Sequence, residues 1–218
     1  MLSVPCNFDR TFSFEADKTA LLAIDMQRDF LDPEGYVASI GGDISMMRAI
    51  MPRFGAVLAA ARDAGLFVVH TREGYQADGS DMSAMKKARR PEQDRGPLGR
   101  FLICGEAGQA LVPELAPMEG EPAFDKPGFS AFFRTDLQAT LEARGITHLI
   151  IMGVTTQCCV HSTLRSAVDY GYYCLTVEDC CAAEEQSLHD EAIVLIYGEK
   201  HLFGWVTQSD RLIPVLCP

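Results

Sequence analysis

Residues 147–171 read THLIIMGVTTQCCVHSTLRSAVDYG, and this stretch decides the fold class. Its first part, Thr147–Gly153, is an apolar run with the length of a buried β-strand. Its second part, from Cys158 to Tyr170, has the apolar spacing of a helix, and Gly171 follows where a helix-ending glycine belongs. A buried strand that leads directly into a helix is typical of the βαβ units that build parallel sheets.

The same alternation continues on both sides of this stretch. Further strands are predicted at Thr19–Asp25, Leu66–Thr71, Pro122–Asp125, Tyr172–Val177 and His201–Val206. Further helices are predicted at Ile44–Ala64, Thr135–Arg144 and Glu185–Tyr197. Pro52 interrupts the first helix, so we expect a kink or a later start there. The pattern predicts one α/β domain over residues 1–218, with a parallel sheet covered by helices on both faces.

Between Arg72 and Glu121 the periodicity is lost, and the segment contains the charged run Lys86–Arg95. An irregular segment of this length in a compact domain is usually functional or disordered. We expect the charged run itself to be solvated or to contact another subunit.

Composition and charge exclude several classes of protein. The 218 residues include 19 Lys plus Arg and 30 Asp plus Glu, so the formal net charge is −11, which argues against nucleic-acid and anionic-membrane partners. No apolar run reaches the roughly 18 residues of a membrane span, and the start of the chain lacks the basic region of a signal peptide. Two adjacent cysteine pairs account for half of the eight cysteines, and neither has the spacing of a zinc or thioredoxin motif. We therefore expect a cytoplasmic protein with mostly free thiols.

Reactive side chains follow three of the predicted strands. Asp25 ends the first strand, Lys126 follows the third, and Cys158 and Cys159 follow the fourth at a helix start. The carboxyl ends of parallel strands meet at one edge of a sheet, where ligands bind. A helix N-terminus and a nearby ammonium both stabilise a thiolate, and a carboxylate can take the thiol proton. The alternative is that a cysteine at a helix start packs as a small apolar residue.

Three segments resemble the signature of the isochorismatase-like cysteine hydrolases: AIDMQRDF, DKPGFSAF and GVTTQCCVHSTLRSAVDYGY. The resemblance implies a three-layer α/β/α fold with a six-stranded, mainly parallel sheet. It implies catalytic roles for Asp25 and Lys126 and assigns the nucleophile to Cys159, which directly precedes a valine. It also implies a cis peptide between Val154 and Thr155, which directs the Thr155 N–H toward an oxyanion beside the N–H of Cys159.

The resemblance also separates branches of the family. True isochorismatases lack the nucleophilic cysteine. Nicotinamidases add a metal site with an Asp-x-His element after the second strand, but here no histidine follows His70 in that loop. We therefore predict no catalytic metal and no cofactor.

Longer segments resemble the biuret- and ureide-hydrolysing branch. The segments HTREGYQADGSD, GPLGRFLICGEAGQALVPELAPMEGE and VEDCC resemble the biuret hydrolases, and HLFGWV resembles the ureidoacrylate amidohydrolases. They imply hydrolysis of a carbamoyl C–N bond of a small ureide of the biuret or triuret type, with release of ammonia. The chain departs from this branch after Gly128. There the lysine motif of the biuret hydrolases continues with a second lysine, whereas this chain has Phe129 and Ser130. It also has Glu199 where glutamine is usual. Because a carboxylate only accepts hydrogen bonds, Glu199 favours a donor-rich ureide such as triuret.

Four residues are candidates for substrate binding. Phe30 and Phe129 could form an apolar wall, or could simply pack in the core. Arg72 could donate to a substrate carbonyl, or could pair with Glu73 or another acid. Glu199 is the fourth candidate.

Three other readings remain open. The substrate could be another small amide, such as ureidoacrylate or an N-carbamoyl amino acid. The paired cysteines could belong to a redox or thiol-storage protein. An inactive family member acting as a binding module is disfavoured by the intact set of Asp25, Lys126 and Cys159. Related folds commonly form dimers or tetramers, so we also expect a homo-oligomer.

Overall fold

The computed structural model describes residues 1–89 and 94–217, apart from the side chains of Arg89 and Glu199. Its centre is a six-stranded sheet in the order β10-β9-β8-β3-β4-β7, and every neighbouring pair is parallel. The strands are β3 (Thr19–Ile24), β4 (Phe67–Glu73), β7 (Ala123–Lys126), β8 (His148–Val154), β9 (Tyr173–Ala182) and β10 (Trp205–Thr207). The predicted α/β fold class with a six-stranded parallel sheet is confirmed.

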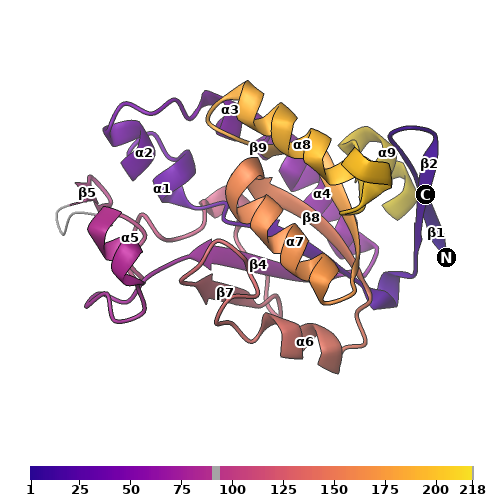
Figure 1. The fold of residues 1–218 in the computed structure, drawn as a ribbon, viewed down its shortest axis with the longest axis horizontal. Coiled ribbons are helices and arrows are strands. Elements are labelled where there is room, and N and C mark those ends of the chain that lie inside the picture. The colour runs from indigo at the N-terminus through magenta and orange to yellow at the C-terminus, as the bar shows by residue number, and fades with distance from the viewer. Residues whose placement is uncertain (90–93, 218) are drawn as a thin grey trace.

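Helices cover both faces of this sheet (Figure 1). The helices α3 (Ser45–Ala49), α4 (Met51–Asp63) and α9 (Ser209–Leu216) pack on one face. The helices α7 (His161–Asp169) and α8 (Gln186–His201) pack on the other, and α6 (Leu137–Ala143) precedes β8. Because the sheet is covered twice, β3 is buried at every position, as its unbroken apolar sequence requires.

Several boundaries differ from the prediction. The helix predicted at 44–64 is two helices that meet at Ile50, because Pro52 lies in the first turn of α4, where its missing N–H is tolerated. The last strand was predicted to begin at His201, which is wrong: α8 continues to His201, and β10 begins at Trp205.

Several elements were not predicted. They are the hairpin β1 (Leu2–Cys6) and β2 (Arg10–Phe14), the helices α1 (Arg28–Leu31), α2 (Tyr36–Ser39) and α9, and, in the irregular segment, α5 (Ala84–Arg89), β5 (Arg95–Gly96) and β6 (Gly99–Arg100). The single domain spanning residues 1–218 stays a prediction.

The two central strands approach each other closely where they end. Gly153, near the end of β8, has φ +140°, and a Cβ placed on it would lie 2.1 Å from the carbonyl oxygen of Ile24 in β3. Only glycine fits this contact. It brings the segments that carry Asp25 and Cys159 together at one edge.

None of the helices within residues 1–89 and 94–217 combines the length and the apolar character that crossing a membrane requires.

Candidate active site

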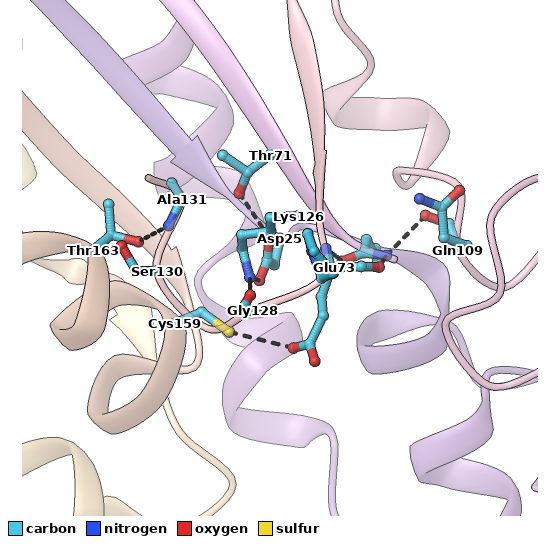
Figure 2. Close-up of polar contacts among 12 residues, drawn as sticks. Asp25, Thr71, Glu73, Gln109, Lys126, Gly128, Ser130, Ala131, Cys159 and Thr163 are labelled. Carbon is cyan, nitrogen blue, oxygen red and sulfur yellow. Dashed lines mark hydrogen bonds and ion pairs between the residues drawn. The ribbon is translucent and has the colours of Figure 1, made fainter. Parts of the chain in front are cut away.

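Three strand ends bring a carboxylate, an ammonium and a thiol into one buried cluster (Figure 2). Asp25 directly follows β3, Lys126 ends β7, and Cys159 lies in a π-helical turn, Thr156–Val160, that follows β8. The Nζ of Lys126 lies 2.7 Å from Oδ2 of Asp25. The structure therefore brings together the three residues that the sequence singled out as catalytic.

Asp25 leaves its strand in a conformation that few side chains adopt. Its φ is +52°, in the left-handed region, where aspartate is better tolerated than most residues. Its N–H donates to the carbonyl of Thr71, and its carbonyl accepts from the N–H of Gln27 at 2.7 Å. The hydroxyl of Thr71 donates to Oδ1 of Asp25 at 2.6 Å. The carboxyl group is thus fixed by both its backbone and its partners.

Lys126 is fully buried and donates to the carbonyl of Gly128 at 3.0 Å. Burial alone would lower the pKa of Lys126, but the negative charges of Asp25 and Glu73, joined by that of Cys159 when its thiol is ionised, outweigh it and raise the pKa. The side chain therefore stays an ammonium.

The loop that follows Lys126 is attached to the helix that follows Cys159. The N–H of Ala131 donates to Oγ1 of Thr163 at 2.9 Å, and the hydroxyl of Ser130 donates to that of Ser166 at 2.8 Å. These contacts fix the two halves of the site relative to each other.

The surroundings of Cys159 favour the protonated thiol over the thiolate. The neighbouring Cys158 thiol, burial and the charge of Asp25 raise its pKa well above the ordinary range. Burial likewise raises the pKa of Asp25, with Lys126 opposing it. A carboxylate of raised pKa beside a thiol is suited to accept its proton.

The remaining expectations from the sequence concern the peptide after Val154 and the other cysteines. The peptide between Val154 and Thr155 is cis, as the resemblance implied. Cys158 is half-buried and packs against the core, while Cys180 and Cys181 are buried in β9. All eight cysteines lie in the described part of the chain and are free thiols.

A family model described as the isochorismatase domain matches residues 19–211. The chain belongs to the isochorismatase family.

Relatives of this isochorismatase-family chain are hydrolases. A protein of Klebsiella pneumoniae named ureidoacrylate amidohydrolase RutB is 31% identical over 100% of this chain and 94% of its own length. A protein of Variovorax paradoxus with the same name is 34% identical, over 94% and 84% of the two chains. The crystal structure of a cysteine hydrolase from Pseudomonas syringae pv. phaseolicola matches with a TM-score of 0.83 and 25% identity, covering 94% of this chain and 95% of that one. The chain is a hydrolase of amide C–N bonds, as the sequence predicted.

The isochorismatase-family site holds a second carboxylate that the sequence analysis missed. Glu73 ends β4 and is 3% exposed. Its Oε2 accepts a hydrogen bond from the thiol of Cys159, with an Sγ–Oε2 distance of 3.6 Å. Its Oε1 accepts a hydrogen bond from the hydroxyl of Tyr75. The apolar run predicts that the second strand ends at Thr71, and the sequence suggests Glu73 only as a partner for Arg72. Its position at the carboxyl end of that strand was the available signal.

Gln27 fixes the backbone of Glu73. The Nε2 of Gln27 donates to the carbonyls of Glu73 and Gln109, both at 2.9 Å, and its Oε1 accepts the N–H of Glu73 at 2.7 Å. Gln27 is itself fully buried, so its amide is shielded from water and hydrogen-bonds to the protein through these three bonds.

The four predicted substrate-binding residues lie in different places. Phe30, in α1, packs edge-to-face against Phe101 at a centroid distance of 5.9 Å. Arg72 points away from the cluster and pairs with Asp125, with Nε 2.7 Å from Oδ1. Phe129 is 43% exposed. Glu199 lies in the last turns of α8, and its side chain lies outside the described residues.

The expectation that the charged run is solvated or contacts another subunit is wrong for Lys86. Its side chain is only 14% exposed, and its ammonium lies 3.4 Å from Oε1 of Glu73 and donates to the hydroxyl of Tyr75. It also donates to the carbonyl of Pro127 at 3.1 Å and lies 4.4 Å from the ring centroid of Phe129. Residues 90–93 of that run lie outside the described part of the chain.

Asp25, Glu73 and Cys159 present ligand atoms within 4.8 Å of one another, close enough to hold a metal ion. However, each oxygen of Asp25 already has a partner, since Oδ2 contacts the ammonium of Lys126 and Oδ1 accepts from the hydroxyl of Thr71. These two groups take the place that a metal cation would have. The predicted lack of a catalytic metal stays a prediction.

Proposed function

We propose that the protein is a cysteine amidohydrolase that cleaves a carbamoyl C–N bond of a small ureide through a thioester intermediate. Cys159 is the nucleophile, Asp25 the general base and acid, and Lys126 the cation that holds them. The observation that carries this proposal is the buried contact of Asp25 with Lys126 beside the Cys159 thiol, at the carboxyl ends of three strands.

The proposed reaction follows from these roles. Asp25 takes the thiol proton of Cys159, and the thiolate attacks the substrate carbonyl carbon. As the C–N bond breaks, Asp25 returns the proton to the leaving nitrogen, and ammonia departs. Asp25 then takes a proton from a water molecule that attacks the thioester, which restores the thiol and releases the acid product.

Backbone amides complete this proposal. The N–H groups of Thr155 and Cys159 would hold the oxyanion of each tetrahedral intermediate. One such donor typically contributes about 2.7–4 kcal/mol to transition-state stabilisation. Lys126 stabilises the negative charge that passes between Asp25 and the sulfur.

Two kinds of ureide are candidates. The relatives in Klebsiella pneumoniae and Variovorax paradoxus, which are named for ureidoacrylate and match over most of their length, favour that acidic ureide. The resemblance of the segment after β4 to biuret hydrolases favours biuret or triuret. N-carbamoyl amino acids share the same scissile group and belong in the same test.

Ammonia release from this panel tests the function. We expect turnover of at least one ureide by the wild-type protein and none by Cys159→Ala, with the two proteins melting at similar temperatures. Cys174→Ala is the matched control and should keep activity, because this buried thiol lies at the start of β9, at the opposite end of the sheet from the cluster. Turnover by purified Cys159→Ala would exclude the thiol mechanism.

The thiol-storage reading predicts a different result. It requires a reversible disulfide, which thiol counting after mild oxidation would detect. The cytoplasmic location and the homo-oligomer stay predictions.

A further inference from the structure

The turn that carries Cys159 is tied to α8 by a buried polar contact. Thr156 is the first residue of this turn, Thr156–Val160, and is fully buried. Its hydroxyl lies 2.9 Å from Nδ1 of His189, which lies in the first turn of α8 and is 7% exposed. α8 itself packs on the turn. The contact therefore joins two elements that are far apart in the sequence, and the proposed mechanism gives it no role.

A turn of this kind needs support from outside itself. π-helical geometry is rare and occurs mostly as single turns, frequently at functional sites. Within the turn, the carbonyl of Thr155 accepts the N–H groups of Cys158 at 3.1 Å and Val160 at 3.3 Å. These local bonds set the curvature of the backbone, but they do not set where the turn lies relative to the rest of the molecule. The contact of Thr156 with α8 supplies such a reference.

The side chain of His189 is suited to hold a hydroxyl group. Burial lowers the pKa of His189, against the opposing charges of Glu178 and Asp190, so the imidazole is neutral at pH 7. A neutral imidazole has one N–H donor and one acceptor nitrogen, and a hydroxyl both donates and accepts. The bond to Thr156 can therefore form with either ring tautomer, and loss of either residue removes it.

The place of Thr156 in the chain connects this bond to the chemistry. Thr156 directly follows Thr155 and precedes Cys159 by three residues. The proposed function uses the N–H groups of Thr155 and Cys159 as the two oxyanion donors, so Thr156 lies between them. A displacement of Thr156 moves both donors relative to the substrate carbonyl. A displacement of about 1 Å can cost about 100-fold in rate.

We infer that His189 is a positioning residue for the oxyanion donors of this site: its hydrogen bond with the hydroxyl of Thr156 holds the turn in place, and both donor N–H groups with it. The inference rests on the proposed function and goes beyond it, because it gives a role in the reaction to a residue outside the catalytic three and outside the turn.

Removing either partner of the bond tests this on a ureide that the wild-type protein hydrolyses. His189→Leu and Thr156→Val each remove one partner and keep a side chain of similar size. We expect kcat to fall by about 10- to 100-fold in each, with KM changed by less than about threefold, because oxyanion donors act in the transition state. The double variant should fall no further than the slower single variant, since both changes remove the same bond.

Conservative variants separate the hydrogen bond from bulk. His189→Asn places an amide group where Nδ1 of the imidazole lies, and Thr156→Ser keeps the hydroxyl, so both should retain most of kcat. His148→Leu is the matched control. Nδ1 of His148 likewise lies 2.8 Å from the hydroxyl of Thr147, but this contact is at the start of β8, at the opposite end of that strand from Cys159. Its loss should leave kcat unchanged.

Thiol modification distinguishes misplaced donors from general damage to the site. Methyl methanethiosulfonate transfers its methylthio group to a thiolate and releases methanesulfinate, so no carbonyl is attacked and no oxyanion forms. Tandem mass spectrometry measures the rate of this reaction at Cys159. We expect the rate in His189→Leu to stay within about threefold of the wild-type rate while hydrolysis falls.

The remaining outcomes overturn the inference and leave the amidohydrolase function standing. They are an unchanged kcat in His189→Leu or Thr156→Val, an equal loss in His189→Asn and His189→Leu, and parallel losses of hydrolysis and thiol modification. If one of the two main variants does not fold, the other decides. If neither folds, the contact serves stability alone, which also overturns the inference. If the wild-type protein hydrolyses no ureide, the proposed function fails, and the inference fails with it.

Discussion

The ammonium of Lys126 lies 2.7 Å from the carboxylate of Asp25, and neither side chain has any exposed surface. Removing one partner of such a pair leaves the other charged or forces it to change protonation. Lys126→Met should therefore abolish turnover and lower the free energy of unfolding by about 3–5 kcal/mol. Urea denaturation at pH 7 measures this.

The double variant Asp25→Asn with Lys126→Met should recover much of that stability while staying inactive, because no buried charge is left alone. Lys18→Met is the exposed control. It breaks the pair with Glu15, whose side chains are 49% and 45% exposed, and should change stability by less than about 1 kcal/mol. Stability of Lys126→Met equal to that of the wild type would contradict the expectation.

The acid limb of the pH–rate profile should reflect the ionisation of Asp25. Burial raises its pKa, and a general base works only when ionised, so kcat/KM should fall with decreasing pH in a range above that of an ordinary aspartate. Thr71 donates to the charged form and lowers this pKa. Thr71→Val should therefore move the limb to higher pH.

Thr176→Val is a suitable control for that experiment. Thr176 is also fully buried in a strand of the sheet, but its hydroxyl has no hydrogen-bond partner among the described residues. Its replacement should leave the limb in place. A limb that is unmoved or lowered in Thr71→Val would argue against Asp25 as the base.

Glu121 should make stability depend on pH in acid. Burial alone would raise its pKa, but hydrogen bonds from Arg62, the N–H of Met118 and His70 outweigh it and lower the pKa from 4.5 to about 2. The folded pKa is below the unfolded one, so the stabilisation is present above pH 4.5 and is lost as the pH falls toward 2. It amounts to roughly 3 kcal/mol at neutral pH.

Glu121→Gln should lower stability at pH 7 and flatten its decline between pH 4.5 and 2, as measured by denaturant unfolding at each pH. Glu34→Gln, at an exposed position, should preserve the wild-type slope. The same slope in both variants would show that Glu121 does not carry the effect.

Gly153 should tolerate no side chain. Gly153→Ala places a Cβ 2.1 Å from the carbonyl of Ile24, so β3 and β8 must separate where the site is built. We expect loss of activity and a fall in unfolding free energy of several kcal/mol, roughly the upper range of single substitutions. Gly171→Ala, at φ +88° with no atom within 4 Å of the added Cβ, should show only the smaller backbone cost of roughly 1 kcal/mol. Equal effects of the two changes would remove the close contact as the cause.

The sheet and the three catalytic candidates could be predicted from the sequence. Buried parallel strands are unbroken apolar runs, so the residues at which they end can be identified. The sequence was insufficient for Glu73 and Lys86. Charged residues at a strand end and in a charged run are usually solvated, and only the tertiary contacts of Tyr75 show that these two are buried together. The hairpin Leu2–Phe14 alternates apolar and polar residues and could have been predicted from that period.

An ion pair between Arg72 in β4 and Asp125 in the edge strand β7 links the two strands. The next two opposite positions along these strands are Glu73 and Lys126, whose side chains face the site. Since a slip of one residue turns every side chain of a strand to the opposite face, the outer pair locks the register of the strand that bears the catalytic lysine. A contact on the outside of the molecule thus decides which charges lie within it, and the site can be disabled without a change to any residue that touches the substrate.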